Sequence, residues 1–241
     1  MASGARPRTH QGSTAALVRS AVLAAGPGRF WGSRDFADLG APATAVVAAL
    51  QRLRASGELV SVRRGLYYRG RQRPWGMSRP SAHDVVARVA GRRGVGPAGL
   101  SAANDLGLST QVPAADLVAV PGPVPRDFPA VHFVGRRART ARAAASLRPR
   151  EVAILEVLDA WDDVLEVSRP AAVSLLAAML VDGSVRPAAL VAASIDEPPA
   201  VRERLRAVLM QAGLSGLAAK VSRAAARGTR DRALAGLLAP R

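Results

Sequence analysis

The sequence contains no cysteine among its 241 residues, and this absence excludes several kinds of protein. A disulfide scaffold, a thiol nucleophile and a zinc or iron–sulfur site held by thiolates are all ruled out. The three histidines, His10, His83 and His132, are widely separated, which argues against a histidine-rich metal site. Lysine occurs once, as Lys220, and no Ser/His/Asp set, phosphate-binding loop or metal-binding motif is visible. We therefore expect a protein without enzymatic activity, metal or cofactor.

Aromatic residues and long apolar runs are also scarce. Aromatics make up 4% of the chain while hydrophobic residues make up 49%, so a core must consist mainly of alanine, leucine and valine. The longest uncharged apolar stretch in the C-terminal half, residues 170–181, is too short to cross a bilayer. The first eleven residues include two arginines but no apolar segment, unlike a secretory signal. These features predict a cytoplasmic protein that has no membrane partner.

Positive charge is abundant and unevenly placed. The chain has 34 basic and 18 acidic side chains, a net charge of +16, and a GC-rich codon bias accounts for arginine in place of lysine but not for this excess. Residues 1–79 hold 13 arginines and three acids, residues 80–214 hold 15 arginines and 14 acids, and residues 215–241 hold six basic residues and one acid. A basic head and tail around a near-neutral middle favour a nucleic-acid-binding module joined to a part with another task.

The first part of the chain has the pattern of three helices. Apolar residues at helical spacing, a Ser33 N-cap and Pro42 in a first turn predict helices over residues 14–25, 33–39 and 42–56. The buried stripe of the third helix is expected to consist of Val46, Ala49, Leu50 and Leu53.

Two short strands are predicted next, over residues 59–62 and 66–68, around the basic turn Arg63-Arg64-Gly65. Three helices followed by a basic hairpin is the order of a winged helix-turn-helix domain. A helix fits the major groove of DNA, and arginines of the wing can reach phosphates or the minor groove. We expect double-stranded DNA as the partner, because the charge argues against the alternative of a module that binds only protein.

Eight residues are predicted to contact DNA, although each could instead be an ordinary solvated side chain. On the third helix, the residues expected to read bases are Thr44, Gln51 and Arg52. The residues expected to bind phosphates are Arg34, Arg54, Arg63 and Arg64. Tyr67 and Tyr68 alternate on a strand, so one belongs in the core and the other, assigned as Tyr68, can touch the DNA backbone.

Beyond this module, residues 70–82 are rich in arginine, proline and glycine and are interpreted as a linker. Alternating helical and strand patterns predict a larger domain over residues 83–212, followed by a basic tail over residues 213–241, while residues 1–13 are expected to be disordered. The predicted fold class is α+β, with an N-terminal winged helix-turn-helix domain over residues 14–69 followed by the larger mixed α+β domain.

Two motifs in the second part invite chemical interpretations. Residues 94–99 match GxGxxG, but a predicted helix precedes them and Pro97 lacks an N–H group, so a dinucleotide fingerprint is rejected. A predicted helix from Arg150 and the segment after it carry the acidic cluster Glu151, Glu156, Asp159, Asp162, Asp163 and Glu166. A solvated acidic face is the favoured interpretation, and a partner-binding patch or a metal or acid–base centre, as in a nuclease, are the alternatives.

Two ordered stretches resemble the AbiEi-type antitoxins of type IV toxin–antitoxin systems, over roughly residues 14–212. The first consists of Asp35-Phe36, Leu39-Gly40, Ala-Leu-Gln-Arg-Leu at 49–53, Gly57 and Arg-Arg-Gly-Leu-Tyr-Tyr at 63–68. The second consists of Ala-Ala-Asn at 102–104 and Leu-Gly-Leu-Ser-Thr-Gln-Val-Pro at 106–113. Val-Pro-Gly at 120–122 departs from the Thr-x-Gly-like turn expected there.

The resemblance implies a two-domain protein. The winged helix would bind inverted repeats upstream of its own operon and repress it, with residues 42–54 as the recognition helix and residues 63–68 as the wing. The C-terminal domain would act as an antitoxin against a nucleotidyltransferase-like toxin encoded next to it. The alternative is a winged-helix transcription factor without a toxin, whose second domain serves dimerisation or another partner.

Overall fold

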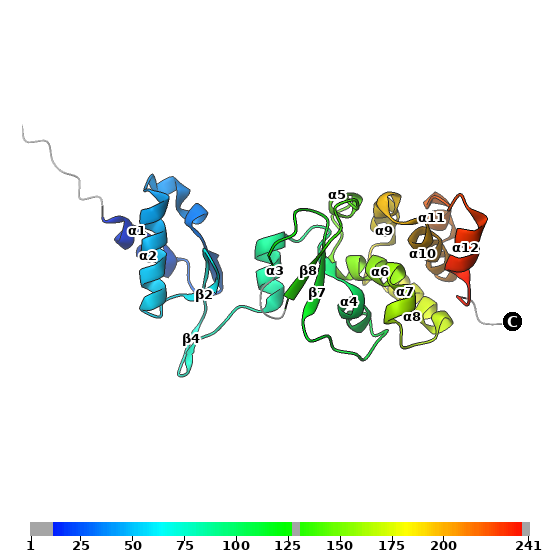
Figure 1. Ribbon diagram of the computed structural model, residues 1–241, viewed down its shortest axis with the longest axis horizontal. Coiled ribbons are helices and arrows are strands. Elements are labelled where there is room, and N and C mark those ends of the chain that lie inside the picture. Colours follow the sequence, from blue (N-terminus) through cyan, green and yellow to red (C-terminus); the bar gives the residue numbers. More distant parts are fainter. Residues whose placement is uncertain (1–11, 127–130, 238–241) are drawn as a thin grey trace, which may run out of the picture. The chain divides into compact units, whose positions relative to one another are not determined.

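The computed structural model describes residues 12–126 and 131–237 and divides the chain into two compact units, Met1–Arg88 and Val89–Arg241. Each unit combines helices with a small sheet, so the predicted α+β class is confirmed (Figure 1). Their buried apolar residues form two separate clusters with no member in common. Of the segment 1–13 expected to be disordered, all but Gly12 and Ser13 lies outside the described residues, and Ser13 caps the first helix through its hydroxyl.

The first unit has the predicted order of helices and hairpin. Its elements are α1 (Thr14–Ala24), β1 (Arg29–Trp31), the 3-10 helix η1 (Ser33–Leu39), α2 (Ala43–Ala55), β2 (Val60–Arg63) and β3 (Leu66–Arg69). The strands form an antiparallel sheet in the order β1-β3-β2. Strand β1 was not expected from the sequence, because three residues at a sheet edge are too few to show a period.

Local chemistry explains where these elements begin and end. Helix η1 begins at Ser33 and is capped by Gly32, whose N–H donates to the Asp35 carboxylate at 2.6 Å, so Gly32 and not Ser33 is the N-cap. Helix α2 ends before Gly57, whose φ of 76° is a left-handed conformation that glycine adopts without strain. The stripe of Val46, Ala49, Leu50 and Leu53 is buried, as its spacing predicted.

The segment expected to be a linker has structure of its own. Residues 70–82 contain a two-stranded hairpin, β4 (Gln72–Arg73) and β5 (Gly76–Met77), and the start of helix α3 (Ala82–Ala90). Pro74 and Gly76 occupy the second and fourth positions of the tight turn, where the commonest β-turn favours these residues. Composition alone indicated a linker because proline and glycine also shape tight turns.

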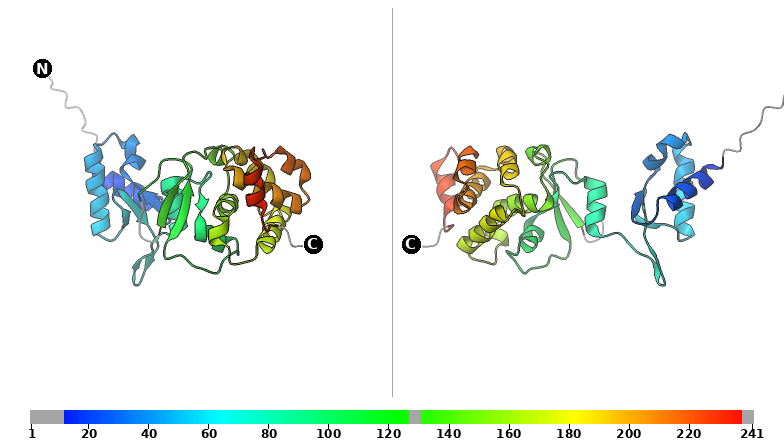
Figure 2. Two further views of the ribbon diagram at one scale, coloured as in Figure 1. Left: turned by 45° about the vertical axis from the view of Figure 1, so that its right-hand side comes forward. Right: turned by 180° about the vertical axis from the view of Figure 1, so that it is seen from behind.

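The second unit is built around a small sheet and a buried helix. The sheet contains β6 (Gly96–Pro97), β7 (Asp116–Val120) and β8 (Val131–Gly135), with β6 antiparallel and β8 parallel to β7. The helices are α4 (Gly99–Asp105), α5 (Ala141–Ala144), α6 (Pro149–Asp159), α7 (Trp161–Val164), α8 (Arg169–Val181), α9 (Pro187–Ala193), the 3-10 helix η2 (Ser194–Asp196) and α10 (Pro199–Gln211). Figure 2 shows the helices that follow β8 gathered on one side of this sheet.

The second unit continues into the segment expected to be a basic tail. Helices α11 (Ser215–Lys220) and α12 (Arg227–Leu234) lie against α10, and Ala218, Val221 and Leu237 join the buried core. Two charged side chains of α10 hold this segment: Arg206 donates to the carbonyl of Val221 at 2.9 Å, and Glu203 accepts the backbone N–H of Ala224 at 2.6 Å. The domain therefore extends through Leu237.

The GxGxxG motif has a packing role in this unit. A Cβ atom on Gly96 would lie 2.5 Å from the carbonyl oxygen of Pro149 and 2.8 Å from Cβ of Val152, both on α6. Gly94 and Gly99 both have positive φ, and a Cβ on Gly94 would lie 2.7 Å from the backbone of Ala143. These glycines allow the backbone of β6 to lie directly on α6 and α5.

Replacing Gly96 with alanine is therefore expected to destabilise the second unit by about 1–3 kcal/mol, because the added methyl group forces β6 away from α6. Gly122→Ala is the control, since a Cβ at Gly122 meets no atom within 4 Å. Urea unfolding of both variants measures the effect, and equal midpoints for the two would contradict this packing role.

Candidate nucleic-acid interface

Helix α2 presents one side chain face to the core and the opposite face to solvent. Thr44, Ala48, Gln51 and Ala55 are separated by four, three and four residues, so they lie along one line of the helix, and all four are exposed. Two of them are alanines, whose small side chains leave room for a ligand to approach the helix beside Thr44 and Gln51. Arg52 and Arg54, both exposed, lie on the two flanks of this outward face.

The other predicted contacts lie on the elements around α2. Arg34 is exposed on η1, and Arg64 is exposed in the turn between β2 and β3, where Arg63 is half-buried. Tyr67 is the buried tyrosine of β3, while Tyr68 is half-buried with its ring 4.9 Å from that of Phe30. The structure therefore brings Thr44 and Gln51 together on one face and leaves all eight predicted side chains at least partly open to solvent.

Several arginines of the first unit are occupied by internal partners. Arg19 pairs with Glu58 at 3.1 Å, and Arg69 donates to the carbonyls of Val22 and Leu23 at 3.0 and 2.8 Å, where α1 ends. Arg52 donates its Nε to the carbonyl of Ala48 at 3.2 Å, which leaves its terminal nitrogens free.

Other arginines of this unit remain available. Between Gly12 and Arg79, eight arginine side chains have no hydrogen bond or ion pair: Arg29, Arg34, Arg54, Arg63, Arg64, Arg71, Arg73 and Arg79. Of these, Arg29 lies over the ring of Trp31, 5.2 Å from its centroid. Arg71, Arg73 and Arg79 were not expected as DNA contacts from the sequence, because they fall in the segment predicted to be a linker. Only their position on a defined hairpin and their lack of acidic neighbours make them candidates.

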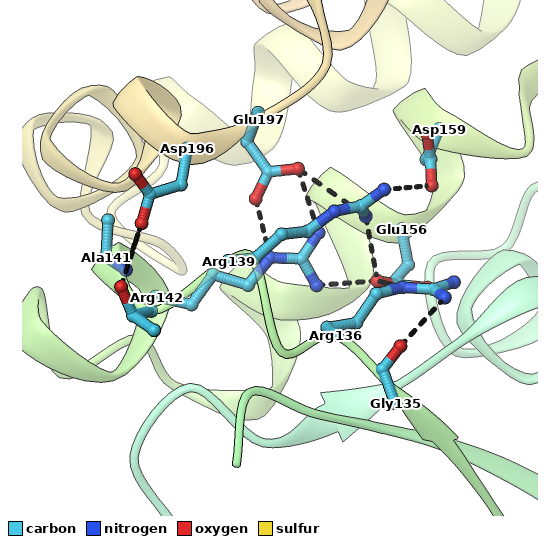
Figure 3. Close-up of polar contacts among 10 residues, drawn as sticks. Gly135, Arg136, Arg139, Ala141, Arg142, Glu156, Asp159, Asp196 and Glu197 are labelled. Atoms are coloured by element: carbon cyan, nitrogen blue, oxygen red, sulfur yellow. Dashed lines mark hydrogen bonds and ion pairs between the residues drawn. The ribbon is translucent and has the colours of Figure 1, made fainter.

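The acidic cluster of the second unit is only partly a solvated face. Asp162, Asp163 and Glu166 are exposed, but Glu151 and Glu156 are buried, so the interpretation was wrong for these two glutamates. Glu156 is 1% exposed and accepts hydrogen bonds from Arg136 at 2.7 and 2.8 Å and from Arg142 at 2.5 Å (Figure 3). Arg142 is fully buried and also donates to Glu197 at 2.6 and 3.0 Å. Arginines in the segment from the end of β8 to α5 thus neutralise Glu156, which the sequence pattern had predicted to lie on the solvated face of a helix.

The remaining acids of the cluster are dispersed over different partners. Glu151 is buried and accepts from Arg186 at 2.6 and 2.7 Å, and Asp159 accepts from Arg139 at 2.7 Å. Asp162 pairs with Arg169 and Arg204, Glu166 accepts from Thr110, and Asp163 is exposed. In the part of the chain that the structure describes, no three histidine, aspartate or glutamate side chains converge so that they could hold a metal ion.

Hydrogen bonds and nearby arginines lower the pKa values of three of these carboxylates. Burial acts to raise the pKa of Glu156, but the hydrogen bond from Arg136 and the charge of Arg142 outweigh it and hold that pKa below its ordinary value. The pKa of Glu151 is lowered in the same way, against burial, by Arg186 and by backbone N–H groups. For Glu166, the backbone N–H and hydroxyl of Thr110 lower the pKa to about 2. These carboxylates are anionic structural partners of arginines and amides at neutral pH.

The fold and the surface together define an α+β protein whose first unit exposes a polar helix face and a set of unpaired arginines. A sequence profile of a family of unknown function (DUF6088) matches residues 22–147. The match spans more than half of the chain, and the chain belongs to this family. It includes α2, the turn between β2 and β3, and the hairpin β4–β5.

The chain is also similar to a solved structure. No curated protein matches the sequence. The crystal structure of the RV2827C protein from Mycobacterium tuberculosis is similar over 88% of this chain and 83% of that chain, at 16% identity and a TM-score of 0.43. Within the described residues, no helix combines the length and the apolar character that crossing a membrane requires.

Proposed function

We propose that this protein is a cytoplasmic DNA-binding autorepressor and antitoxin of a type IV toxin–antitoxin operon. The observation that carries the DNA-binding part is the outward face of α2, with Thr44 and Gln51 exposed opposite a buried stripe and exposed arginines on both sides. The order α1, η1, α2 and hairpin β2–β3 supports a winged helix, in which α2 enters the major groove and the hairpin turn is the wing.

The electrostatics support a phosphate partner. Arg34, Arg54, Arg63 and Arg64 have no internal counter-charge, and acids are rare in this unit. Leaving these guanidinium groups unpaired raises self-repulsion in the free protein, and a polyanion relieves that repulsion while releasing its own counterions. Thr44 and Gln51 carry groups that donate and accept hydrogen bonds, as contacts with base edges require.

The antitoxin part of the proposal rests on the resemblance to the AbiEi-type antitoxins. It assigns the second unit the task of counteracting a nucleotidyltransferase-like toxin encoded beside this gene, and it assigns no catalysis to the unit. A cell that expresses the neighbouring toxin should stop growing, and co-expression of this protein should restore growth. Unchanged arrest, together with repression of the promoter, would instead favour a transcription factor without a toxin.

The DNA-binding part is tested by fluorescence anisotropy with the protein's own upstream DNA and a scrambled duplex at two salt concentrations. A preference for the upstream DNA that persists at the higher salt is the expected result. Equal binding to both duplexes that disappears with salt would mean that the charge of the protein acts without specificity, and the autorepressor proposal would be abandoned.

Two sets of substitutions should distinguish residues that bind phosphates from residues that read bases. Arg63→Ala/Arg64→Ala should weaken binding to every duplex and lower the slope of log K against log salt by ~0.9 for each lost phosphate contact. Gln51→Ala or Arg52→Ala should instead cost about 1–3 kcal/mol at one base position and leave the slope nearly unchanged.

The matched control for charge is Arg223→Ala/Arg227→Ala, which removes two exposed arginines from the second unit. This variant should bind the upstream DNA like the wild type. If the Arg63/Arg64 and Gln51 variants behave alike, the assignment of α2 as the recognition helix is wrong.

A further inference from the structure

The hairpin β4–β5 is a defined structure that the proposed winged helix does not require. Its base is closed by two hydrogen bonds between Arg71 and Ser78, from the N–H of Arg71 to the Ser78 hydroxyl and from the N–H of Ser78 to the Arg71 carbonyl, each at 2.9 Å. Gly70 lies so close to Ser78 that any side chain at this position would overlap the Ser78 backbone. The close packing at the base holds the hairpin in a set direction, and Figure 1 shows it projecting from the rest of the first unit.

The tip of this hairpin carries a large apolar side chain in solvent. Trp75 is 84% exposed, whereas Trp31 and Trp161 are 5% and 2% exposed. Pro74 and Trp75 are the two residues of the turn that joins Arg73 to Gly76. Because Trp75 is exposed, its indole does not contribute the stabilisation that burial in the core of this unit would give.

The surroundings of Trp75 are strongly basic. Arg71, which directly precedes β4, and Arg73 are two residues apart and so lie on the same side of the extended chain, and Arg79 follows the hairpin. All three side chains are exposed and have no internal partner. The stretch from Leu59 to His83 contains six arginines and no acidic residue. An apolar tip among unpaired arginines suits a polyanion with stacked aromatic bases, because the indole can contact the bases while the arginines bind phosphates. It suits a protein surface that lacks acidic residues less well.

The hairpin lies near α2 but away from the proposed wing. Strand β3 connects the Arg63-Arg64 turn at one end to Gly70 and the hairpin at the other, so the two basic elements are at opposite ends of that strand. Its base shares a cavity of about 530 Å³ with the C-terminal end of α2, lined by Ser56, Gly57, Arg71, Gln72 and Met77 among others. The base of the hairpin therefore lies beside the end of α2 that carries Arg52 and Arg54.

We propose that hairpin β4–β5 is a second DNA contact, which inserts Trp75 into the minor groove against the base pairs while Arg71 and Arg73 bind the adjacent phosphates. The inference rests on the proposed DNA-binding function. Minor-groove proteins use apolar wedges to open a base step and bend the duplex, and arginines bind the enhanced negative potential of a narrow minor groove. The hairpin supplies both kinds of group within eight residues, 71–78.

The test uses the fluorescence of the full-length protein. Acrylamide reaches Trp75 far more readily than the other two tryptophans, so the quenchable emission of the free protein comes from Trp75. Adding the upstream duplex should remove most of this quenching. Trp75→Ala should weaken binding to that duplex roughly tenfold and reduce the bend, measured by energy transfer between dyes at the two DNA ends, while Trp75→Phe should retain most of both.

Matched variants locate the effect. Val112→Ala, another substitution of a strongly exposed apolar residue but in the second unit, should leave affinity and bending unchanged. Arg71→Ala/Arg73→Ala should lower the salt slope without changing the emission of the free protein.

The outcomes separate this inference from the proposed function. If the wild-type protein shows no preference for its upstream DNA, the proposed function fails and the inference fails with it. If the wild type binds with preference but Trp75 stays quenchable and Trp75→Ala binds and bends DNA normally, only the inference is overturned. Protection of Trp75 by vesicles of phosphatidylglycerol and phosphatidylcholine, but not by DNA, would likewise overturn it.

Discussion

Replacing Glu156 with glutamine is expected to lower the free energy of unfolding of the second unit by about 3–5 kcal/mol. The substitution keeps the size of the side chain but removes the negative charge that Arg142 and Arg136 contact at 2.5–2.8 Å. Arg142 is fully buried, so it cannot compensate by turning to water. It keeps Glu197, but the network of three arginines loses one of its three carboxylates and is left with one positive charge in excess.

Urea unfolding followed by Trp161 fluorescence measures this effect. Trp161 is buried in the same core cluster as α6, and a Trp31→Phe/Trp75→Phe background makes it the only tryptophan. Asp163→Asn is the control, because it removes the same charge from an exposed side chain on the next helix. A loss below about 1 kcal/mol for Glu156→Gln would mean that the network relaxes and that its glutamates do not hold the unit together.

The same network gives the second unit a pH dependence with a definite sign. Because the pKa of Glu156 and that of Glu151 are lower in the folded protein than their ordinary value of 4.5, their stabilisation is complete above that value. It is lost as the pH falls through the lowered pKa values. The wild type should therefore lose stability in acid more steeply than Glu156→Gln, which has one of these carboxylates fewer.

Leu50→Ala is expected to destabilise the first unit by about 2–5 kcal/mol and to abolish specific DNA binding where that unit unfolds. Leu50 is fully buried at the centre of the α2 stripe, and its core is separate from that of the second unit. A small unit of this size buries little apolar surface, so one cavity removes a large share of its stability. Trp31, in the same cluster as Leu50, reports its unfolding in a Trp75→Phe/Trp161→Phe background.

The matched control is Leu155→Ala, an equally buried leucine on α6 of the second unit. It should shift the transition reported by Trp161 and leave both the Trp31 transition and DNA binding unchanged at temperatures where the first unit is folded. If either substitution shifts both transitions together, the two cores unfold as one, and the assignment of DNA binding to the first unit alone must be tested in another way.

Much of the first unit follows from short-range patterns. The spacing of Val46, Ala49, Leu50 and Leu53 predicted both the helix and its buried side, and the exposure of Thr44 and Gln51 follows from the same period. The hairpin around Arg63, Arg64 and Gly65 was also predicted, because its turn chemistry lies within a few residues. The roles of these side chains on DNA remain predictions.

The predictions that were wrong, on the environment of Glu156 and on the C-terminal segment, have a common cause. In each case the residues that bind the segment lie far from it in the sequence. Glu156 was expected in solvent because no local pattern links it to Arg142, 14 residues earlier, or links Arg142 to Glu197, 55 residues later. The segment 213–241 was expected to be a tail because its small residues show no strong period, yet Arg206 and Glu203 of α10 bind its backbone.

The sequence by itself determined the α+β class, the uneven charge and the helix whose outer face is our candidate for base reading, since composition and helical periodicity are local properties. Only the tertiary structure decided which arginine side chains are free. Arg19 and Arg69 bind partners that lie 39 to 47 residues away in the sequence, whereas the side chains of Arg71 and Arg73 have no partner. It also decided that Glu156 is buried and that Trp75 is exposed. Burial and ion pairing depend on which distant segments meet, and no single stretch of sequence specifies that.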